Sequence, residues 1–124
     1  MGKDLLYGIG IFIPVTDLKK STDWYEKMLG FEMLHEDEPE ANVLKIWNGV
    51  VTFCLVKSSD VEQPAFPENN YGVDHYMNFH TDDIQSIHQS LVEKSANVGD
   101  IHELGGMRGF DLFDPDGNRF SVIE

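Results

Sequence analysis

The sequence is poor in several features, and each shortage restricts what the protein can be. A single cysteine, Cys54, excludes an internal disulfide. No apolar run approaches the roughly 18 residues that a membrane-spanning helix needs. Only 9 basic residues stand against 22 acidic ones, so the net charge is −13. Such a surface repels phosphate backbones and anionic lipids, and we therefore expect neither nucleic acid nor membrane among the partners.

Local catalytic motifs are missing as well. The sequence contains no phosphate-binding loop, zinc-type cysteine cluster, serine-triad signature or dinucleotide glycine pattern. Residues 1–4 carry no apolar stretch of the signal-peptide kind, so we expect a cytoplasmic protein. What is present is an ordinary globular composition over 124 residues, with 41% hydrophobic and 25% charged residues.

The first half predicts a strand, a helix and three further strands. We expect strands over 7–15, 31–35, 43–47 and 50–57, and a helix over 18–29. Asp17 is placed to cap this helix, and Gly30 can end it in the left-handed conformation. Asn48-Gly49, between two apolar runs, predicts a tight hairpin turn in which both residues have positive φ.

The same order returns after a polar linker at 58–70, which contains Pro64 and Pro67. We expect strands over 74–81, 97–103, 109–113 and 120–123, and a helix from Ile84 to Val92 capped by Asp82-Asp83. Asp114-Pro115-Asp116-Gly117 has the composition of a turn.

Two copies of a β-α-β-β-β unit predict an α+β fold. The junction Val15–Leu18 resembles Thr81–Ile84, and Asn48-Gly49 corresponds to Asp116-Gly117. We expect two curved sheets, each with a helix on its outer face, that enclose a cavity. Residues 1–124 then form a single domain, with module one at about 5–57, the linker at 58–70 and module two at about 71–124.

Five segments together resemble the vicinal oxygen chelate superfamily, which includes glyoxalase I, bleomycin-resistance proteins, fosfomycin-resistance enzymes and extradiol dioxygenases. These segments are Val15–Leu18, Trp24–Phe31, Asn78–Ile84, Gly106–Phe110 and Asp114–Asn118. The resemblance covers the chain from about Leu6 to Glu124. It implies a βαβββ pair that forms a homodimer and lines a cavity for a small organic molecule.

In the metalloenzymes of that superfamily, His, Gln or Glu at four strand positions hold a divalent ion. Carried over one at a time, the positions hold Gly10, Cys54, Tyr76 and Ser121. Gly10 has no side chain, and Ser121 stands where the metalloenzymes place glutamate. Because this set lacks imidazole and carboxylate donors, we expect no metal and no other cofactor. A divalent metal held by displaced ligands stays open as the alternative.

Tyr76, Asn78 and His80 alternate along the expected strand 74–81 and would share one face. If His75 faced the cavity instead, this polar set would lie under the helix, where its burial is costly. We therefore expect Tyr76, Asn78 and His80 to line the cavity, and His75 to point away. His80 is our candidate general base, because an imidazole titrates near neutral pH. A solvent-facing sheet surface is the alternative.

Other candidate ligand-binding residues are four aromatic side chains on expected inner strands, one arginine and one serine: Phe12, Trp47, Phe53, Phe110, Arg108 and Ser121. The aromatic rings either pack in the core or stack on a flat or cationic ligand. Arg108 is either a clamp for a carboxylate or phosphate or half of a surface ion pair. Cys54 is more typical of a small core residue than of a nucleophile.

These observations predict a small-molecule-binding protein that sequesters a flat or cationic compound, as antibiotic-sequestering members of the superfamily do. The alternative is a divergent metal-dependent lyase or isomerase of glyoxalase type, similar to lactoylglutathione lyase, or a dioxygenase-like member. A third hypothesis is a structural or regulatory dimer whose cavity is filled by its own side chains. Whether the chain is an enzyme stays open, and the sequence does not identify the ligand.

Overall fold

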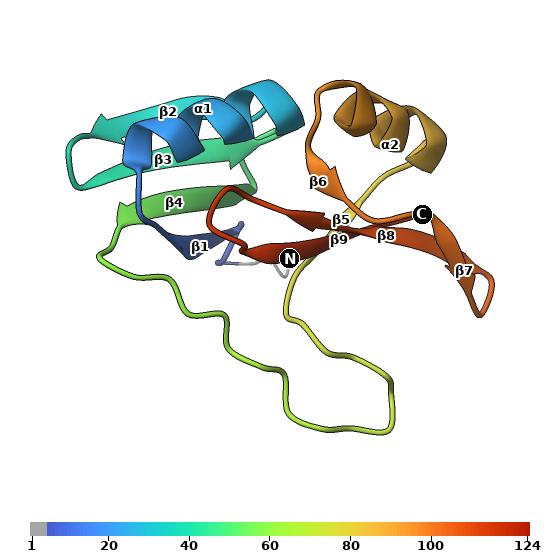
Figure 1. The fold of residues 1–124 in the computed structure, drawn as a ribbon. Helices are drawn as coiled ribbons and strands as arrows, with labels where there is room; N and C mark the ends of the chain where they lie inside the picture. Colours follow the sequence, from blue (N-terminus) through green and yellow to red (C-terminus); the bar gives the residue numbers. More distant parts are fainter. Residues whose placement is uncertain (1–4) are drawn as a thin grey trace. The chain divides into compact units, whose positions relative to one another are not determined.

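Each half of the chain folds into a sheet that one helix covers on one face (Figure 1). The computed structural model describes residues 5–124. It divides the chain into unit 1, which ends at Val61, and unit 2, Glu62–Glu124. The α+β architecture expected from the sequence is confirmed, since both units repeat the same strand, helix and strand order.

Unit 1 holds a four-stranded sheet in the order β1-β4-β3-β2. Its elements are β1 Ile9–Val15, α1 Leu18–Leu29, β2 Glu32–Asp37, β3 Ala41–Ile46 and β4 Val51–Lys57. β1 runs parallel to β4, and the other neighbours are antiparallel. A parallel pair needs a long connection between its strands, and here α1, β2 and β3 provide it.

Helix α1 begins and ends where the sequence predicts. The Asp17 carboxylate accepts a hydrogen bond from the Lys20 N–H at 3.1 Å, which satisfies one donor of the first turn. Gly30 has a φ of 75°, the left-handed conformation that ends many helices at glycine. Leu18 and Tyr25 are buried on the face of the helix that packs against the sheet.

The core of unit 1 is aromatic, and it contains one residue that we had placed in the binding site. Phe53 is only 2% exposed, and its ring centroid lies 5.9 Å from that of Tyr25 and 5.4 Å from that of Phe31. Strand alternation turns this side chain of β4 toward α1, together with Leu55. The prediction that Phe53 lines the cavity is therefore wrong.

The turn between β3 and β4 also differs from the prediction. Positive φ occurs at Trp47 (53°) and Gly49 (87°), and not at Asn48. The Asn48 side chain accepts a hydrogen bond from the Val50 N–H at 3.1 Å. The connection therefore spans residues 47–50 instead of the two residues of a tight hairpin, and it leaves the Trp47 side chain 86% exposed.

Unit 2 repeats this arrangement with the order β5-β9-β8-β6, and β7 pairs with β8. Its elements are β5 Asn78–His80, α2 Ile84–Glu93, β6 Asn97–Val98, β7 His102–Leu104, β8 Met107–Phe113 and β9 Arg119–Ile123. As in unit 1, the first strand runs parallel to the last. α2 is capped by the Asp83 carboxylate and buries Ile84 and Leu91 completely.

Two strands of unit 2 are shorter than expected. The strand predicted over 74–81 is only β5, because the chain bends at His75 and Tyr76. The strand predicted over 97–103 is divided into β6 and β7. No helix or strand forms over residues 58–77, which covers the predicted linker and extends seven residues beyond it.

Candidate functional site

Three strands of unit 2 bring polar side chains into one row. The register aligns Asn78 of β5 with Ser121 of β9, and Ser121 with Asp111 of β8. Phe120 and Val122 are buried on the side of α2. Because side chains alternate along a strand, the row lies on the opposite, open face of the sheet. Asn78 and Ser121 therefore lie on the face that we had predicted for them.

A pocket of about 270 Å³ opens on this face. The chain contains only two arginines, and both line it. The other charged, titratable or hydroxyl side chains in its wall are Asp74, Asp111, His75, His102 and Ser121. Both arginines are paired with carboxylates, Arg108 with Glu124 and Arg119 with Asp74 and Asp111, so the charges around this pocket offset one another.

Within the pocket, a chain of hydrogen bonds begins on one aspartate and ends on a serine. Asp74 Oδ1 lies 2.9 Å from His75 Nδ1, and His75 Nε2 lies 2.9 Å from Ser121 Oγ. An ionised carboxylate can only accept hydrogen bonds, so Nδ1 carries the proton when the imidazole is neutral. Nε2 then accepts from the Ser121 hydroxyl.

Arg119 holds this series of hydrogen bonds in place. Arg119 Nη1 lies 3.2 Å from Asp74 Oδ2. Its Nη2 atom lies 3.3 and 3.2 Å from the two carboxylate oxygens of Asp111. The backbone N–H of Arg119 donates to the Gln63 side chain at 3.0 Å. The guanidinium therefore links the bend before β5 to the middle of β8.

Asp74 should contribute a pH-dependent part of the stability. Its pKa is lowered from the ordinary 3.8, first by the hydrogen bond from His75 and then by Arg119. A folded-state pKa below the unfolded one stabilises the fold above the unfolded value, and this contribution is lost as the pH falls through the folded value. We expect Asp74→Asn to lower the urea midpoint at pH 7. The deficit should shrink below about pH 4, and a deficit that is constant from pH 7 to pH 3 would contradict the assignment.

Arg108 forms an ion pair, the simpler of its two predicted roles. Its Nη2 atom lies 3.1 Å from Glu124 Oε1. The same oxygen accepts a hydrogen bond from the Ile84 N–H at 2.8 Å, at the start of α2. Because its side chain is still 36% exposed and borders the pocket, Arg108 stays available to a ligand.

The remaining predicted residues of unit 2 are spread around the pocket. Tyr76 is 56% exposed, and its ring lies 4.9 Å from that of Phe66. His80 pairs with Ile123 on the open face but does not line the pocket. Phe110 borders the pocket, but it is 1% exposed and its ring packs against His88. A stacking role for Phe110 is therefore corrected to a core role.

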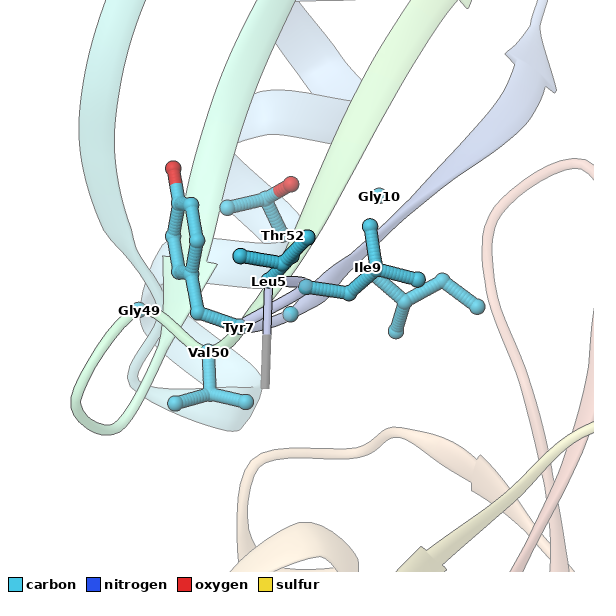
Figure 2. A pocket seen from close by; sticks show the side chains of 9 residues that line it. Leu5, Tyr7, Ile9, Gly10, Gly49, Val50 and Thr52 are labelled. Carbon is cyan, nitrogen blue, oxygen red and sulfur yellow. The ribbon is translucent and has the colours of Figure 1, made fainter. Parts of the chain in front are cut away.

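Unit 1 has a second hollow, of about 280 Å³, at the start of β1, shown in Figure 2. Apart from Tyr7 and Thr52, its side chains are apolar, and it includes Gly10, the first of the four superfamily metal positions. A Cβ atom at Gly10 would lie 3.1 Å from Thr52 Oγ1, so a larger residue there needs Thr52 to move. Within residues 5–124, the wall contains no carboxylate, imidazole, ammonium or guanidinium group.

Other predicted residues of unit 1 lie on the open face of its sheet. Phe12 pairs with Cys54 across β1 and β4, and the Phe12 side chain is 77% exposed. Cys54 is half-buried, and burial, followed by the Asp37 charge, raises the pKa of its thiol. A protonated thiol is a weak metal ligand and a weak nucleophile.

The sequence analysis did not place His75 in this pocket, although His75 bonds to both Asp74 and Ser121 there. Strict alternation along a strand from residue 74 would turn His75 away from Ser121. The bend at His75 and Tyr76 breaks that alternation, so the His75 imidazole reaches the open face that also carries Asn78. No local signal in the sequence indicates this bend.

The four superfamily metal positions carry neither imidazole nor carboxylate side chains. In residues 5–124, no group of three or more His, Cys, Asp or Glu side chains is arranged to hold a metal. At the superfamily positions, Gly10 offers no donor, and the Ser121 hydroxyl is bonded to His75. The Tyr76 ring packs on Phe66.

Comparison with known proteins places this geometry in context. The family model described as Glyoxalase/Bleomycin resistance protein/Dioxygenase superfamily matches residues 9–122. None of the curated proteins compared with the chain matches it significantly. No helix among residues 5–124 has the length and apolarity to cross a membrane.

Solved structures share the fold at low sequence identity. A glyoxalase family protein from Bacillus anthracis has a TM-score of 0.75 at 16% identity, with 100% of this chain and 98% of that chain covered. A lactoylglutathione lyase from Agrobacterium tumefaciens has a TM-score of 0.72 at 19% identity, covering 94% and 91%. TnmS3, an antibiotic binding protein from Streptomyces sp. CB03234, has a TM-score of 0.71 at 19% identity, covering 98% and 96%.

Proposed function

Since the chain belongs to the Glyoxalase/Bleomycin resistance protein/Dioxygenase superfamily, we propose that it binds a small organic molecule without a divalent metal. The observation that carries this proposal is the donor chemistry at the four superfamily metal positions. Glycine, a protonated thiol, a phenol and a hydroxyl stand there instead of imidazoles and carboxylates. Such groups hold a divalent ion poorly, yet they suit hydrogen bonding and apolar contact with an organic ligand.

The ligand proposed is a flat or cationic compound. Phe12 and Trp47 of unit 1 expose 77% and 86% of their surface, an unusual exposure for large aromatic side chains. Aromatic faces attract flat rings and cations, and the net charge of −13 attracts cations at longer range. TnmS3, which has the same fold, is an antibiotic binding protein, and this supports sequestration as the role.

The setting proposed for this activity is the cytoplasm, with a second copy of the chain as partner. The superfamily resemblance, which implies a homodimer, supports the second copy. A strongly acidic chain with one cysteine is compatible with a reducing compartment.

A thermal-shift screen tests the binding function. We expect a flat aromatic cation to raise the melting temperature equally with and without EDTA, because a ligand at 100 times its Kd stabilises the folded state by about 2.7 kcal/mol. Phe12→Ala and Trp47→Ala should weaken the shift. His35→Ala, a change at an exposed residue of β2, is the matched control and should leave the shift intact. A shift that appears only with added metal would support the lyase or isomerase instead.

A further inference from the structure

The hydrogen-bonded chain in unit 2 has the connectivity of an activated nucleophile, and the superfamily assignment does not account for it. Asp74, His75 and Ser121 follow one another at 2.9 Å and 2.9 Å. We propose that Ser121 is a nucleophile that accepts an acyl group, with His75 as its base. The protein would then hydrolyse small carboxylic esters. Ester hydrolysis goes beyond ligand binding, because binding alone forms no covalent bond between protein and ligand.

The direction of the proton supports the assignment of roles. With Nδ1–H donated to Asp74, the free lone pair of His75 is on Nε2, next to the Ser121 hydroxyl. The carboxylate fixes this tautomer and stabilises the imidazolium that forms during attack. The Asp74 side chain is 67% exposed, and Arg119 holds its second carboxylate oxygen at 3.2 Å. Asp74 and Arg119 are therefore positioning residues, whereas His75 and Ser121 are catalytic.

The surroundings of Ser121 suit a small acyl group. The pocket measures about 270 Å³. Besides Asp74, His75 and Ser121, its wall includes Met107, Gly109 and Ile123. This volume lies just below the range of about 300–1,000 Å³ typical of drug-sized ligands, so short acyl groups fit best. Asn78 neighbours Ser121 in the register on the same face of the sheet, and it lies outside the pocket wall.

The reaction balances without any oxidant or metal. Ser121 Oγ attacks the ester carbonyl carbon, and its proton passes to His75 Nε2. The bond from that carbon to the alcohol oxygen breaks, and the alcohol leaves with the proton. Water then attacks the acyl-serine and gives a proton to Nε2. The carboxylic acid leaves, and Ser121 Oγ recovers the proton, so ester and water become acid and alcohol.

The test uses p-nitrophenyl acetate, p-nitrophenyl butyrate and an alkyl fluorophosphonate on the whole chain, with peptide mapping of the adduct. We expect one adduct, on Ser121, and its loss in Ser121→Ala. His75→Ala should slow acylation by about 100- to 10,000-fold, the usual contribution of a general base. Asp74→Asn should slow it less. Ser59→Ala and His35→Ala change exposed residues outside the pocket and should leave the rate unchanged.

Two further outcomes keep the proposal open to refutation. Ser121→Cys keeps a nucleophile at the same place, so it should form an adduct on the new thiol even if Ser121→Ala folds poorly. Ester hydrolysis that is unchanged in well-folded Ser121→Ala, or an adduct on a lysine or histidine, would overturn the proposal. Because adduct mass and reversible melting shifts are separate readouts, failure here would leave the proposed ligand binding by Phe12 and Trp47 standing.

Discussion

Phe53→Ala should destabilise the protein by about 3–5 kcal/mol, the usual cost of removing a buried phenylalanine side chain. The ring is 2% exposed and packs between Tyr25 and Phe31, so its removal leaves a cavity beneath α1. Natural domains have a total stability of about 5–15 kcal/mol, and this loss would take a large share of it. Urea denaturation followed by circular dichroism measures the change.

Phe12→Ala is the matched control for this prediction. Phe12 lies on the neighbouring strand β1, but its side chain is 77% exposed on the opposite face of the sheet. Its loss should change the stability by less than about 0.5 kcal/mol, as is usual for exposed positions. Equal losses in the two variants would contradict the assignment of Phe53 to the core and Phe12 to the open face.

Asp114→Ala should destabilise unit 2 by about 2–4 kcal/mol, because buried hydrogen-bond donors that lose their acceptor cost about 1–3 kcal/mol each. The Asp114 carboxylate is 4% exposed and accepts from the backbone N–H groups of Asp116 (2.9 Å) and Asn118 (2.8 Å). It also accepts from the Asn118 side chain at 2.8 Å. This turn sets the start of β9, which carries Arg119 and Ser121.

The same variant should therefore disturb the pocket as well as the fold. Asp114→Asn keeps one oxygen, which can still accept from the two backbone N–H groups, and it should lose about half as much stability. Melting temperature and the rate of Ser121 acylation should fall together across the wild type, Asn and Ala series. A fully stable Asp114→Ala protein would show that the turn does not depend on this side chain.

Much of the fold can be predicted because local signals and tertiary packing agree. Asp17 and Gly30 determine both ends of α1, and the Asp83 cap determines the start of α2. The repeat of strand and helix order predicts two similar sheets, as observed. The prediction from composition was wrong at the β3–β4 turn. Asn-Gly favours a two-residue loop with positive φ at both residues, but positive φ occurs at Trp47 and Gly49.

The site was harder to predict because it depends on where a strand begins. Alternation assigns faces correctly only inside a paired strand, and β5 pairs with β9 over residues 78–80 alone. Asn78 therefore falls on the expected face, whereas His75 reaches Ser121 on the face from which alternation would turn it away. Phe53 and Phe110 illustrate a second limit of the sequence. An apolar ring in an alternating strand is compatible with either face of the sheet, and only the position of the helix decides which face is buried.

The direct test of metal-free ligand binding is the metal content of the protein. Tag-free chain is loaded with nickel, zinc, manganese or iron(II), desalted, and measured by plasma emission spectrometry. We predict no stoichiometric metal in any of the four samples, together with a melting shift by the organic ligand that EDTA does not change. Near-stoichiometric metal that is lost in His75→Ala or His80→Ala would contradict the account, and it would establish a metal site built from displaced ligands.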